Sequence, residues 1–561
     1  MNDILLAHLA DTFGAEAAEK IELRPVPEHE NGDIALSFFR LSKEMQKSPM
    51  EIAAMVKDAL QSLDMIQEAV AAGPYCNVTI APQHYFNAVM NAPLSTQTHA
   101  GQHILIEYSS PNTNKPLHIG HSRNNALGGA LSSMYEAAGA KVTRVSIINN
   151  RGTHICKSML MYLRNENGET PEQTGEKPDH LVGRYYRNFT IAAEKNPEME
   201  QEAQAMLQQW EAGDVDVRAL WERMNEWVYA GWNATYERQR MRFDQWYYES
   251  EIYVDGKAMV DEGLQKGLFY KKDDGAVAVD LADYKLDEKI LQRSDGTSIY
   301  ITQDLALACK RQAEHEADKM IYITAIPQNY HFQVLFILLN ILGKVPQKKL
   351  SHIGYGLISL PEGKMSSRKG TVIQADAAMD ELHNLAFAAI TERNPQMPEP
   401  ERREAAEEIM NGAWKFYMLS VTPKKGIVYD AERAVRFEGS TGPYLQYAGV
   451  RIQSLFQKSG VDMDSITGDA GLLGDAEKPL GAKILEWQNV LERAVADENP
   501  TTITTYLLEL TQSWSSYYAS TSVLNAESEE IKNARLLLAR KVYTVLKNGL
   551  NLLGIDIPKK M

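Results

Sequence analysis

Two histidines spaced three residues apart stand where a predicted strand gives way to a predicted helix. His118 and His121 follow the apolar segment ILIEY (104–108) and a turn rich in Ser, Asn and Pro. A strand, a turn and a helix in this order leave backbone N–H groups unpaired at the helix start, and these groups bind anions such as phosphate. The spacing puts both imidazoles on one helix face, and Gly120 between them lets a ligand approach the backbone. An ordinary turn with two solvated histidines fits the pattern equally well, so a second motif is needed.

A second stretch that suits phosphate is PEGKMSSRKG (361–370), which follows another predicted strand. Three cations fall within six residues, beside two hydroxyls and between glycines: Lys364, Arg368 and Lys369, with Ser366 and Ser367. A glycine-flanked loop with cations and hydroxyls is suited to clamping a triphosphate. As a single match, a solvated basic loop is the commoner explanation. The pairing with His118 and His121, in this order along the chain, makes the combination specific.

Both motifs need an α/β core to position them. We predict core strands at five places: 104–108, 141–149, 298–302, 319–325 and 351–360. Helical segments lie between them, for example from Gln303 onward and at 331–342, which is the alternation typical of βαβ units. Residues 99–164 and about 290–378 are therefore expected to form two halves of one sheet. In an open sheet of this kind, ligands bind at the carboxyl ends of the strands, where both motifs fall.

An insertion at about 165–290 interrupts this predicted sheet. It is expected to be helical as far as residue 250, and it holds five of the eight tryptophans. Aromatic residues interleaved with charges can form a nucleic-acid surface, but a helical subdomain that packs its own core is the commoner explanation. A small α/β domain is predicted before the sheet, at 1–98, and an all-helical bundle after it, at 379–561. This leaves 99–378 for the catalytic domain.

Composition excludes several classes of protein. The chain has 561 residues and a net charge of −16, so it is not an indiscriminate nucleic-acid binder, although a local basic face can still hold a specific polyanion. Cys76, Cys156 and Cys309 are too far apart for zinc ligands and are expected to be reduced and buried. The apolar runs are too short to span a membrane, and the N-terminus does not read as a signal peptide. A cytoplasmic protein without membrane contact is expected.

The HIGH and KMSS motifs together resemble those of the class I aminoacyl-tRNA synthetases. The wider sequence is similar to that of arginyl-tRNA synthetases, in EYSSPNTNKPLHIGH (107–121), YITQD (300–304), KMSSRKG (364–370), GPYLQYAGVR (442–451) and a chain ending in Pro558-x-x-Met561. The resemblance covers essentially the whole chain, including the N-terminal domain. It implies a split Rossmann-like parallel sheet with an inserted subdomain, a small N-terminal α/β domain and a C-terminal all-α anticodon-binding bundle.

The resemblance also implies a two-step reaction. The carboxylate of L-arginine attacks the α-phosphate of ATP and releases pyrophosphate, and the terminal ribose of tRNA(Arg), through its 2′-hydroxyl, then takes the arginyl group. The attacking carboxylate is already ionised, so the site has to supply position and charge neutralisation rather than a base. By resemblance, His118, Gly120 and His121 meet the nucleotide, and Lys364 with its loop holds the β- and γ-phosphates. Magnesium is expected to arrive with the ATP, whereas no metal-binding residues, zinc or tightly bound cofactor are expected.

Arginine makes a physical demand of its own. A guanidinium is planar, always charged and rich in donors, so its pocket should offer carboxylates and neutral acceptors. Glu107 ends the first core strand, and Asp304 follows Tyr300 at another predicted strand end. Matched to the family, the arginine-binding residues are Glu107, Ser110, Asn112, Tyr300, Asp304 and Gln328. Of these, Asn112 would hold the backbone end of the amino acid. The guanidinium would meet Tyr300, Asp304 and Gln328.

Two positions depart from the family pattern. Asn150 precedes Arg151 and Gly152 where the family commonly has Asp, which removes a negative charge near the site. Gln303 stands where the family usually has Arg, so no family role is carried over to its side chain.

The candidate tRNA contacts lie in the two outer domains. In the C-terminal bundle they are Tyr444, Gln446, Tyr447 and Arg451, and in the N-terminal domain they are Tyr75 and Asn77. An aromatic ring can stack on an exposed base and an amide can read its edge, but buried packing explains the tyrosines equally well. The resemblance further implies that tRNA binds before arginine is activated, and that the enzyme is a monomer.

Other functions fit the sequence less well. A cysteine-specific synthetase would need thiolate zinc ligands that three scattered cysteines do not supply. A lysine-specific synthetase agrees with the charges, but a forked set of acceptors fits a guanidinium better. The length and the helical C-terminus disfavour a small HIGH-type nucleotidyltransferase. A non-catalytic tRNA-binding relative is disfavoured because His118, His121, Lys364, Glu107 and Asp304 are all intact.

Overall fold

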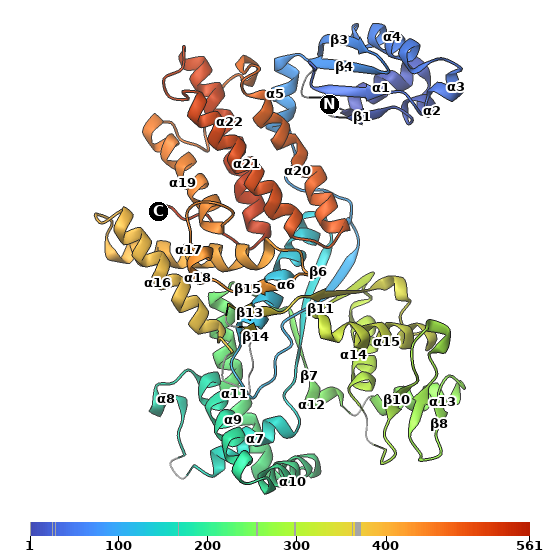
Figure 1. Cartoon of the computed structure of the whole chain (residues 1–561), viewed down its shortest axis with the longest axis vertical. Coiled ribbons are helices and arrows are strands. Elements are labelled where there is room, and N and C mark those ends of the chain that lie inside the picture. The colour runs from blue at the N-terminus through green and yellow to red at the C-terminus, as the bar shows by residue number, and fades with distance from the viewer. Residues whose placement is uncertain are drawn as a thin grey trace. The chain divides into compact units, whose positions relative to one another are not determined.

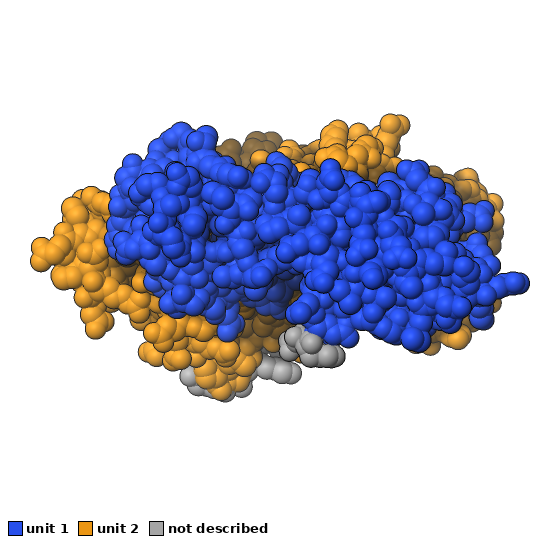
Figure 2. All heavy atoms as spheres, turned by 90° about the horizontal axis from the view of Figure 1, so that it is seen from above, with its two compact units in different colours: residues 1–94, 451–488, 509–546 blue, residues 95–450, 489–508, 547–561 orange. Residues whose placement is uncertain are grey.

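The computed structural model (Figure 1) describes residues 2–24, 26–27, 30–165, 168–253, 256–296, 299–361, 363–364 and 372–561. These residues form two compact units, coloured in Figure 2. Unit 1 comprises residues 1–94, 451–488 and 509–546, and unit 2 comprises residues 95–450, 489–508 and 547–561. Each unit is therefore assembled from segments that are distant in the sequence.

The N-terminal part of unit 1 is a four-stranded antiparallel sheet with helices. The strand order is β1-β2-β4-β3. The strands are β1 (Glu22–Arg24), β2 (Ile34–Ser37), β3 (Ile66–Ala72) and β4 (Tyr75–Ile80). The helices are α1 (Asn2–Phe13), α2 (Ala15–Ala18), α3 (Ser42–Met45), α4 (Pro49–Leu60) and α5 (Pro82–Asn91). Ser48 and Glu51 form a capping box that fixes the start of α4.

A five-stranded parallel sheet is the centre of unit 2, with the order β12-β11-β5-β6-β7. The strands are β5 (His103–Glu107), β6 (Lys141–Ile148), β7 (Gln245–Tyr248), β11 (Lys319–Ala325) and β12 (Leu350–Tyr355). Their apolar, β-branched residues are buried, as expected for a sheet covered on both faces. The strands predicted at 104–108, 141–149 and 319–325 are confirmed.

The predicted strand at 298–302 is wrong over its described part. Ile299 is the N-cap residue of helix α14 (Tyr300–His315), so Tyr300 begins a helix, Asp304 lies one turn further along it, and neither is at a strand end. The run of Ile, Tyr and Thr has β-propensity, but its wider spacing is helical. Ile301, Leu305 and Ala308 recur every three or four residues and are all buried in the core. Tertiary packing therefore overrides local propensity here.

Two further expectations for the core need correction. The stretch expected to be helical as far as residue 250 does contain long helices, but Gln245–Tyr248 is the edge strand β7 of the main sheet. The predicted strand at 351–360 divides into β12 and β13 (Ile358–Leu360), which belong to different sheets. Gly356 lies at the break, where a side chain would collide with the backbone of Lys425 and Gly426.

The remaining elements of unit 2 are helices and two small sheets. Helices α6 (Ile119–Ala137) and α15 (Asn329–Ile341) contact strands of the main sheet. The other helices are α7 (Thr153–Leu163), α8 (Pro171–Thr174), α9 (Pro178–Lys195), α10 (Glu198–Ala212), α11 (Val215–Arg238), α12 (Glu249–Ile252), α13 (Gly256–Gln265), α16 (Ala375–Arg393), α17 (Glu399–Leu419) and α18 (Ala431–Ala434). The small sheets are β8 (Tyr270–Lys271), β9 (Val277–Val279) and β10 (Lys289–Gln292), and β13 with β14 (Gly363–Lys364) and β15 (Ile427–Val428).

The aromatic insertion packs a core of its own, as predicted. Trp232, Tyr185 and Phe189 are buried together with apolar residues of α7, α10 and α11. The C-terminal region is helical as expected, apart from the two-residue strand β15. Its long helices are α19 (Gly442–Ser459), α20 (Lys478–Ala496), α21 (Thr501–Ser520) and α22 (Glu529–Leu552).

None of the helices in the described part of the chain combines the length and the hydropathy that a membrane span requires. The three cysteines are free. Cys76 and Cys156 are buried as predicted, whereas Cys309 is only partly buried.

Candidate active site

The turn after β5 is held in an unusual backbone conformation. Ser109 and Ser110 both have positive φ, at 72° and 49°. Such a conformation costs about 1–3 kcal/mol for a residue with a side chain and persists only where its surroundings enforce it. The Ser109 N–H donates to Asn124 Oδ1 at 2.8 Å, and Ser109 Oγ lies 2.7 Å from the Tyr236 hydroxyl. Helices α6 and α11 therefore fix the turn that leads to the histidines.

His118 and His121 cap the start of α6 with their own side chains. His118 Nδ1 accepts a hydrogen bond from the Gly120 N–H at 3.1 Å, and His121 Nδ1 accepts one from the His118 N–H at 3.1 Å. The two rings stack with centroids 3.9 Å apart. A Cβ on Gly120 would lie 2.9 Å from the His118 ring, so glycine is needed for this packing. The predicted helix face that carries both histidines is confirmed.

Both imidazoles are neutral at physiological pH. Burial, with a smaller effect of the Lys115 charge, lowers the pKa of His118 to about 4. The pKa of His121 lies well below its usual value, first because of burial and then because of His118 and Lys115. Since each Nδ1 accepts a hydrogen bond, each ring proton is on Nε2. Two neutral N–H donors at a helix start suit the oxygens of a phosphate.

The segment before α16 is paired with the histidine turn. The Ile119 N–H donates to the Ile373 carbonyl at 3.0 Å, and the Ala375 N–H donates to the Leu117 carbonyl at 2.9 Å. His118 and Gln374 form an antiparallel bridge between these bonds. Of the second motif, the backbone of Lys364 pairs with Ser359 in the small sheet. The predicted phosphate contacts of Ser366, Ser367, Arg368 and Lys369 lie outside the described residues.

Glu107 is buried and already paired. Its carboxylate forms an ion pair with Arg311, which is fully buried, and Ser110 Oγ donates to its other oxygen at 3.4 Å. The Arg311 guanidinium also lies over the Tyr247 ring, 4.7 Å from its centroid. The sequence analysis did not find Arg311, because its partner is 204 residues away. Glu107 therefore presents a carboxylate whose charge is partly compensated from within the protein.

Asp304 joins α14 to α15 beside this pair. His331 Nε2 lies 2.6 Å from Asp304 Oδ2, and the Asp304 side chain is 32% exposed, so its other oxygen remains accessible. Tyr300 is 74% exposed one turn earlier on the same helix. Gln328 ends the short 3-10 helix that follows β11 and is also exposed. The structure gives no direct contact among these three predicted guanidinium ligands.

A second acid that the sequence analysis missed lies near Asp304. Glu249 directly follows β7 and is only 7% exposed. Burial raises the pKa of Glu249 to about 7, while Arg151 opposes this shift and the Asp304 charge adds to it. A buried carboxylate with a raised pKa, at the carboxyl edge of a parallel sheet, is a candidate for binding a cation. The available signal is an acid immediately after the alternating segment QWYY, which lies in a stretch predicted to be helical.

Asn150, one of the two departures from the family pattern, ties two neighbouring segments together. Its Oδ1 accepts from the Ser250 N–H at 3.0 Å, and its Nδ2 donates to the Tyr229 hydroxyl at 3.2 Å. An aspartate could accept the first bond but could not donate the second. Asn150 thus holds the backbone next to Glu249.

Comparisons with known proteins find relatives of this chain over nearly its whole length. The description "tRNA synthetases class I (R), catalytic domain" matches residues 86–429, "Arginyl tRNA synthetase N terminal domain" matches 1–80, and "DALR anticodon binding domain" matches 445–561. An arginine–tRNA ligase of Bacteroides thetaiotaomicron is 40% identical, with 98% of this chain and 97% of that protein aligned. One of Treponema denticola is 39% identical, with 97% and 95% aligned. The chain belongs to the arginyl-tRNA synthetase family.

Solved structures of family members agree with this assignment. The Thermus thermophilus arginyl-tRNA synthetase has a TM-score of 0.81 at 26% identity, covering 100% of this chain and 99% of that one. The Plasmodium falciparum arginyl-tRNA synthetase shares the fold, with a TM-score of 0.76 at 19% identity and coverage of 100% and 98%. The predicted family and fold class are therefore confirmed, and the enzyme is an aminoacyl-tRNA ligase of protein synthesis.

The candidate tRNA contacts of this synthetase occupy different environments. In unit 1, Tyr75 is partly buried, with its ring 5.9 Å from the half-exposed ring of Phe39. Asn77 is buried and donates to Glu30. In unit 2, Gln446 is fully buried, and its amide donates to the carbonyls of Glu408 and Asp556 at 2.9 and 2.7 Å. Gln446 thus holds the fold together rather than lying on its surface.

The remaining candidates lie along α19. Tyr444 is partly buried and Tyr447 is 37% exposed. Arg451 is exposed, with its guanidinium 5.4 Å from the centre of the Tyr518 ring. A pocket of about 450 Å³ runs along residues 518–525 beside that ring. An aromatic face, a cation and a hollow of this size suit an unstacked nucleotide base.

Proposed function

We propose that this chain activates L-arginine with ATP at the carboxyl edge of its parallel sheet and transfers the arginyl group to the terminal ribose of tRNA(Arg). Arginine–tRNA ligation is the activity of the family to which the chain belongs. The observation that carries the site assignment is that unit 2 holds two kinds of binding group. Neutral histidines at the start of α6 suit phosphate, whereas Glu249 and Asp304 suit a cation.

The ATP half of the proposal rests on the start of α6. The Nε2–H groups of His118 and His121 offer hydrogen bonds to phosphate oxygens while both rings are neutral, and the helix dipole at this end favours negative charge. Negative charge grows on the α-phosphate in the transition state. Hydrogen bonds from these donors therefore stabilise the transition state more than the bound substrate, which speeds the reaction. ATP is proposed to arrive as its magnesium complex. Lys364 and its loop are the proposed partners of the β- and γ-phosphates.

The arginine half rests on three carboxylates with different partners. Asp304 has one oxygen held by His331 and the other accessible, and Glu249 is a second acid nearby. These two suit the planar, multiply donating guanidinium. Glu107, which is partly neutralised by Arg311, is proposed to serve the α-ammonium group instead. Its neighbours Ser110 and Asn112, in the turn that leads to the histidines, direct the substrate carboxylate toward ATP.

Attack by that carboxylate on the α-phosphorus forms the arginyl adenylate and releases pyrophosphate. No base is needed in this step because the nucleophile is ionised already. The contribution of the protein is to hold both substrates in line, which is worth several kcal/mol in such reactions. The terminal ribose hydroxyl of tRNA(Arg) then attacks the adenylate carbonyl, and AMP leaves. The proposal takes the enzyme to be a cytoplasmic monomer that binds tRNA through the pocket at 518–525 and the N-terminal sheet.

Pyrophosphate exchange into ATP, measured with each of the twenty amino acids with and without tRNA, tests the proposal. Exchange should depend on arginine and should need tRNA. Exchange with no preference for arginine would overturn the proposed specificity. A complete lack of exchange in the presence of tRNA would instead favour a non-catalytic tRNA-binding protein.

A further inference from the structure

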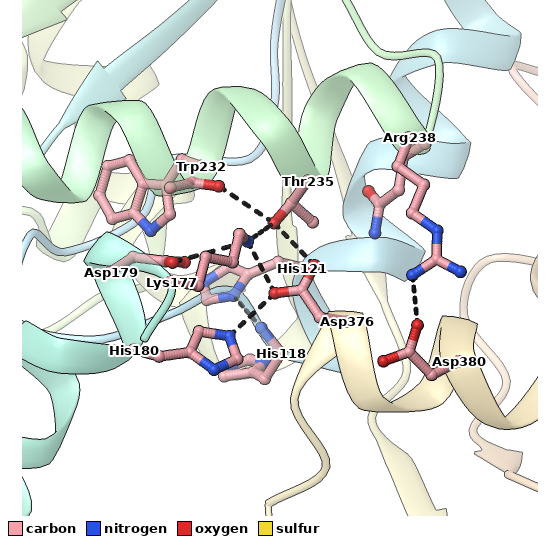
Figure 3. Close-up of polar contacts among 12 residues, drawn as sticks. His118, His121, Lys177, Asp179, His180, Trp232, Thr235, Arg238, Asp376 and Asp380 are labelled. Atoms are coloured by element: carbon pink, nitrogen blue, oxygen red, sulfur yellow. Dashed lines mark hydrogen bonds and ion pairs between the residues drawn. The ribbon is translucent and has the colours of Figure 1, made fainter. Parts of the chain in front are cut away.

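A polar cluster joins three helices of unit 2 (Figure 3). Asp376, in the first turn of α16, accepts hydrogen bonds from Lys177 Nζ at 2.7 Å and His180 Nε2 at 2.9 Å. Thr235 Oγ1 of α11 donates to the other Asp376 oxygen at 3.0 Å and also contacts Lys177 Nζ. Lys177 precedes α9 and also lies 3.5 Å from the Asp179 carboxylate. Helices α9 and α11, both from the insertion, are thus tied to α16 through the carboxylate of Asp376.

The charges within the cluster favour a fixed structure and not a metal site. Ligand atoms of Asp179, His180 and Asp376 lie within 4.8 Å of one another, a spacing that a cation could use. Lys177 Nζ, however, lies within bonding or ion-pair distance of both carboxylates and already supplies the positive charge. A divalent cation would have to displace it and meet its repulsion.

Burial makes this carboxylate sensitive to its partners. Burial alone would raise the pKa of Asp376, but the hydrogen bonds from His180 and Lys177 outweigh burial and lower the pKa to about 2. Asp179 is fully buried, and Lys177 is its only ion-pair partner among the described residues. A Cβ on Gly231 would collide with the Asp179 carboxylate, so the close approach of α9 and α11 depends on glycine at that position. The elements that meet at Asp376 are therefore closely packed.

Asp376 lies two residues beyond a backbone bridge to the histidine turn. The bridge pairs Gln374 with His118, and hydrogen bonds of 2.9 and 3.0 Å flank it. A displacement of the α16 start would accordingly move the backbone at Leu117 and Ile119, and with it the imidazole of His118. By contrast, Glu107 and Asp304 are carried by other elements, β5 and α14.

We propose that Asp376, through Lys177, His180 and Thr235, is a positioning residue that sets the His118–His121 turn for ATP. This inference rests on the proposed function, because it takes that turn to be the ATP site. The cluster joins the inserted helices to the backbone that carries His118. A small misplacement of reacting groups costs roughly 10- to 100-fold in rate.

The chain offers a matched control for this proposal. Arg238 donates to Asp380 at 2.6 Å, so this ion pair also joins α11 to α16, one helical turn beyond Asp376 (Figure 3). The Asp380 side chain is 64% exposed. Asp376→Asn and Asp380→Asn therefore make the same chemical change between the same two helices, at different distances from the bridge.

The experiment is arginine-dependent pyrophosphate exchange of both variants with tRNA present, with the KM for ATP and the KM for arginine measured separately. Asp376→Asn should lower kcat about 10-fold or more and raise the KM for ATP, while the KM for arginine stays within twofold of the wild type. For Asp380→Asn, kcat, the KM for ATP and the KM for arginine should all stay within twofold of the wild type. Asp376→Glu should recover part of the lost kcat because it restores the charge.

Equal losses in the two Asn variants, or an Asp376→Asn loss confined to the KM for arginine, would overturn the positioning role. If Asp376→Asn does not fold, Thr235→Val removes one hydrogen bond from the same carboxylate. It should still reduce kcat severalfold without changing the KM for arginine, and an unchanged kcat would refute the proposal. Wild-type enzyme without arginine-dependent exchange would instead refute the proposed function itself.

Discussion

The affinity for arginine should rise about tenfold between pH 6 and pH 8, because Glu249 has to be ionised to bind a guanidinium. The pKa of Glu249 without substrate is raised to about 7, first by burial. About one tenth of the carboxyl groups are then ionised at pH 6 and about nine tenths at pH 8. The apparent dissociation constant for arginine equals the intrinsic constant divided by the ionised fraction of Glu249, so it falls about tenfold over this range. The KM for ATP serves as an internal control, since the proposed site assigns Glu249 to arginine and not to ATP.

Replacement by Gln should abolish this pH dependence and weaken arginine binding. Loss of a charge-assisted contact to a buried guanidinium costs about 2–3 kcal/mol, or roughly 30- to 150-fold in KM for arginine at pH 8. Glu251, an exposed acid on the same short helix, is the matched control, and Glu251→Gln should leave both the KM and its pH dependence unchanged.

The same substitution should stabilise the substrate-free protein. Folding raises the pKa of the Glu249 carboxyl from 4.5 to about 7. The free energy of unfolding of the protein therefore falls by about 3 kcal/mol in total as the pH rises through that interval. Glu249→Gln carries no such loss, so its free energy of unfolding should exceed that of the wild type at pH 8 but not at pH 4. A KM for arginine that stays flat from pH 6 to pH 8 in the wild type, together with normal arginine binding by Glu249→Gln, would refute this reasoning.

Three more changes have defined outcomes. His118→Asn keeps a helix-capping side chain but loses the Nε2–H donor, so pyrophosphate exchange should fall about 10²- to 10³-fold while stability changes by less than about 1 kcal/mol; a loss below threefold would remove His118 from the ATP site. Arg311→Met leaves Glu107 buried without its partner and should cost about 3–5 kcal/mol in urea unfolding, most of which Arg311→Met/Glu107→Gln should recover. A double variant no more stable than the single one would contradict this pairing. Burial lowers the pKa of Lys415, which donates to the Gly554 carbonyl, to about 7. Since the unfolded lysine stays protonated up to about pH 10.5, stability should rise with pH from 7 toward 10, and Lys415→Met should remove up to about 2.5 kcal/mol of that rise between pH 7.5 and 9.5.

The local sequence predicts a helix or strand correctly where its hydrophobic pattern agrees with the way the element packs. The strand at 319–325 has the predicted bounds, because its apolar residues are buried on both faces of the sheet. The strand predicted at 298–302 failed for the opposite reason, since its β-branched residues also fit a helical spacing and the core uses that spacing. The edge strand β7 was missed within a long helical region, where four residues carry too little pattern to stand out.

The candidate site divides in the same way. His118 and His121 could be paired from sequence because a helix start sets their geometry locally. Arg311 and His331 could not be paired with Glu107 and Asp304, because those contacts connect different elements and depend on how the sheet is assembled. Glu249 was harder to find for a further reason, since the burial that changes its chemistry is a property of the fold and not of the local sequence. The predicted domain boundaries at 98 and 378 remain predictions.

The buried Glu107–Arg311 pair has a consequence for discrimination against uncharged analogues. Arg311 compensates Glu107, which leaves Asp304 and, once it is ionised, Glu249, where the charge of Arg151 opposes the effect of burial without outweighing it. In the proposed site, arginine would bring its guanidinium to these acids, while its α-ammonium and α-carboxylate groups balance each other in charge. Citrulline, which has nearly the same shape but one positive group fewer, would leave a buried carboxylate uncompensated. Electroneutrality, in addition to shape, therefore rejects the near-isostere, and the protein sets this balance with an arginine of its own.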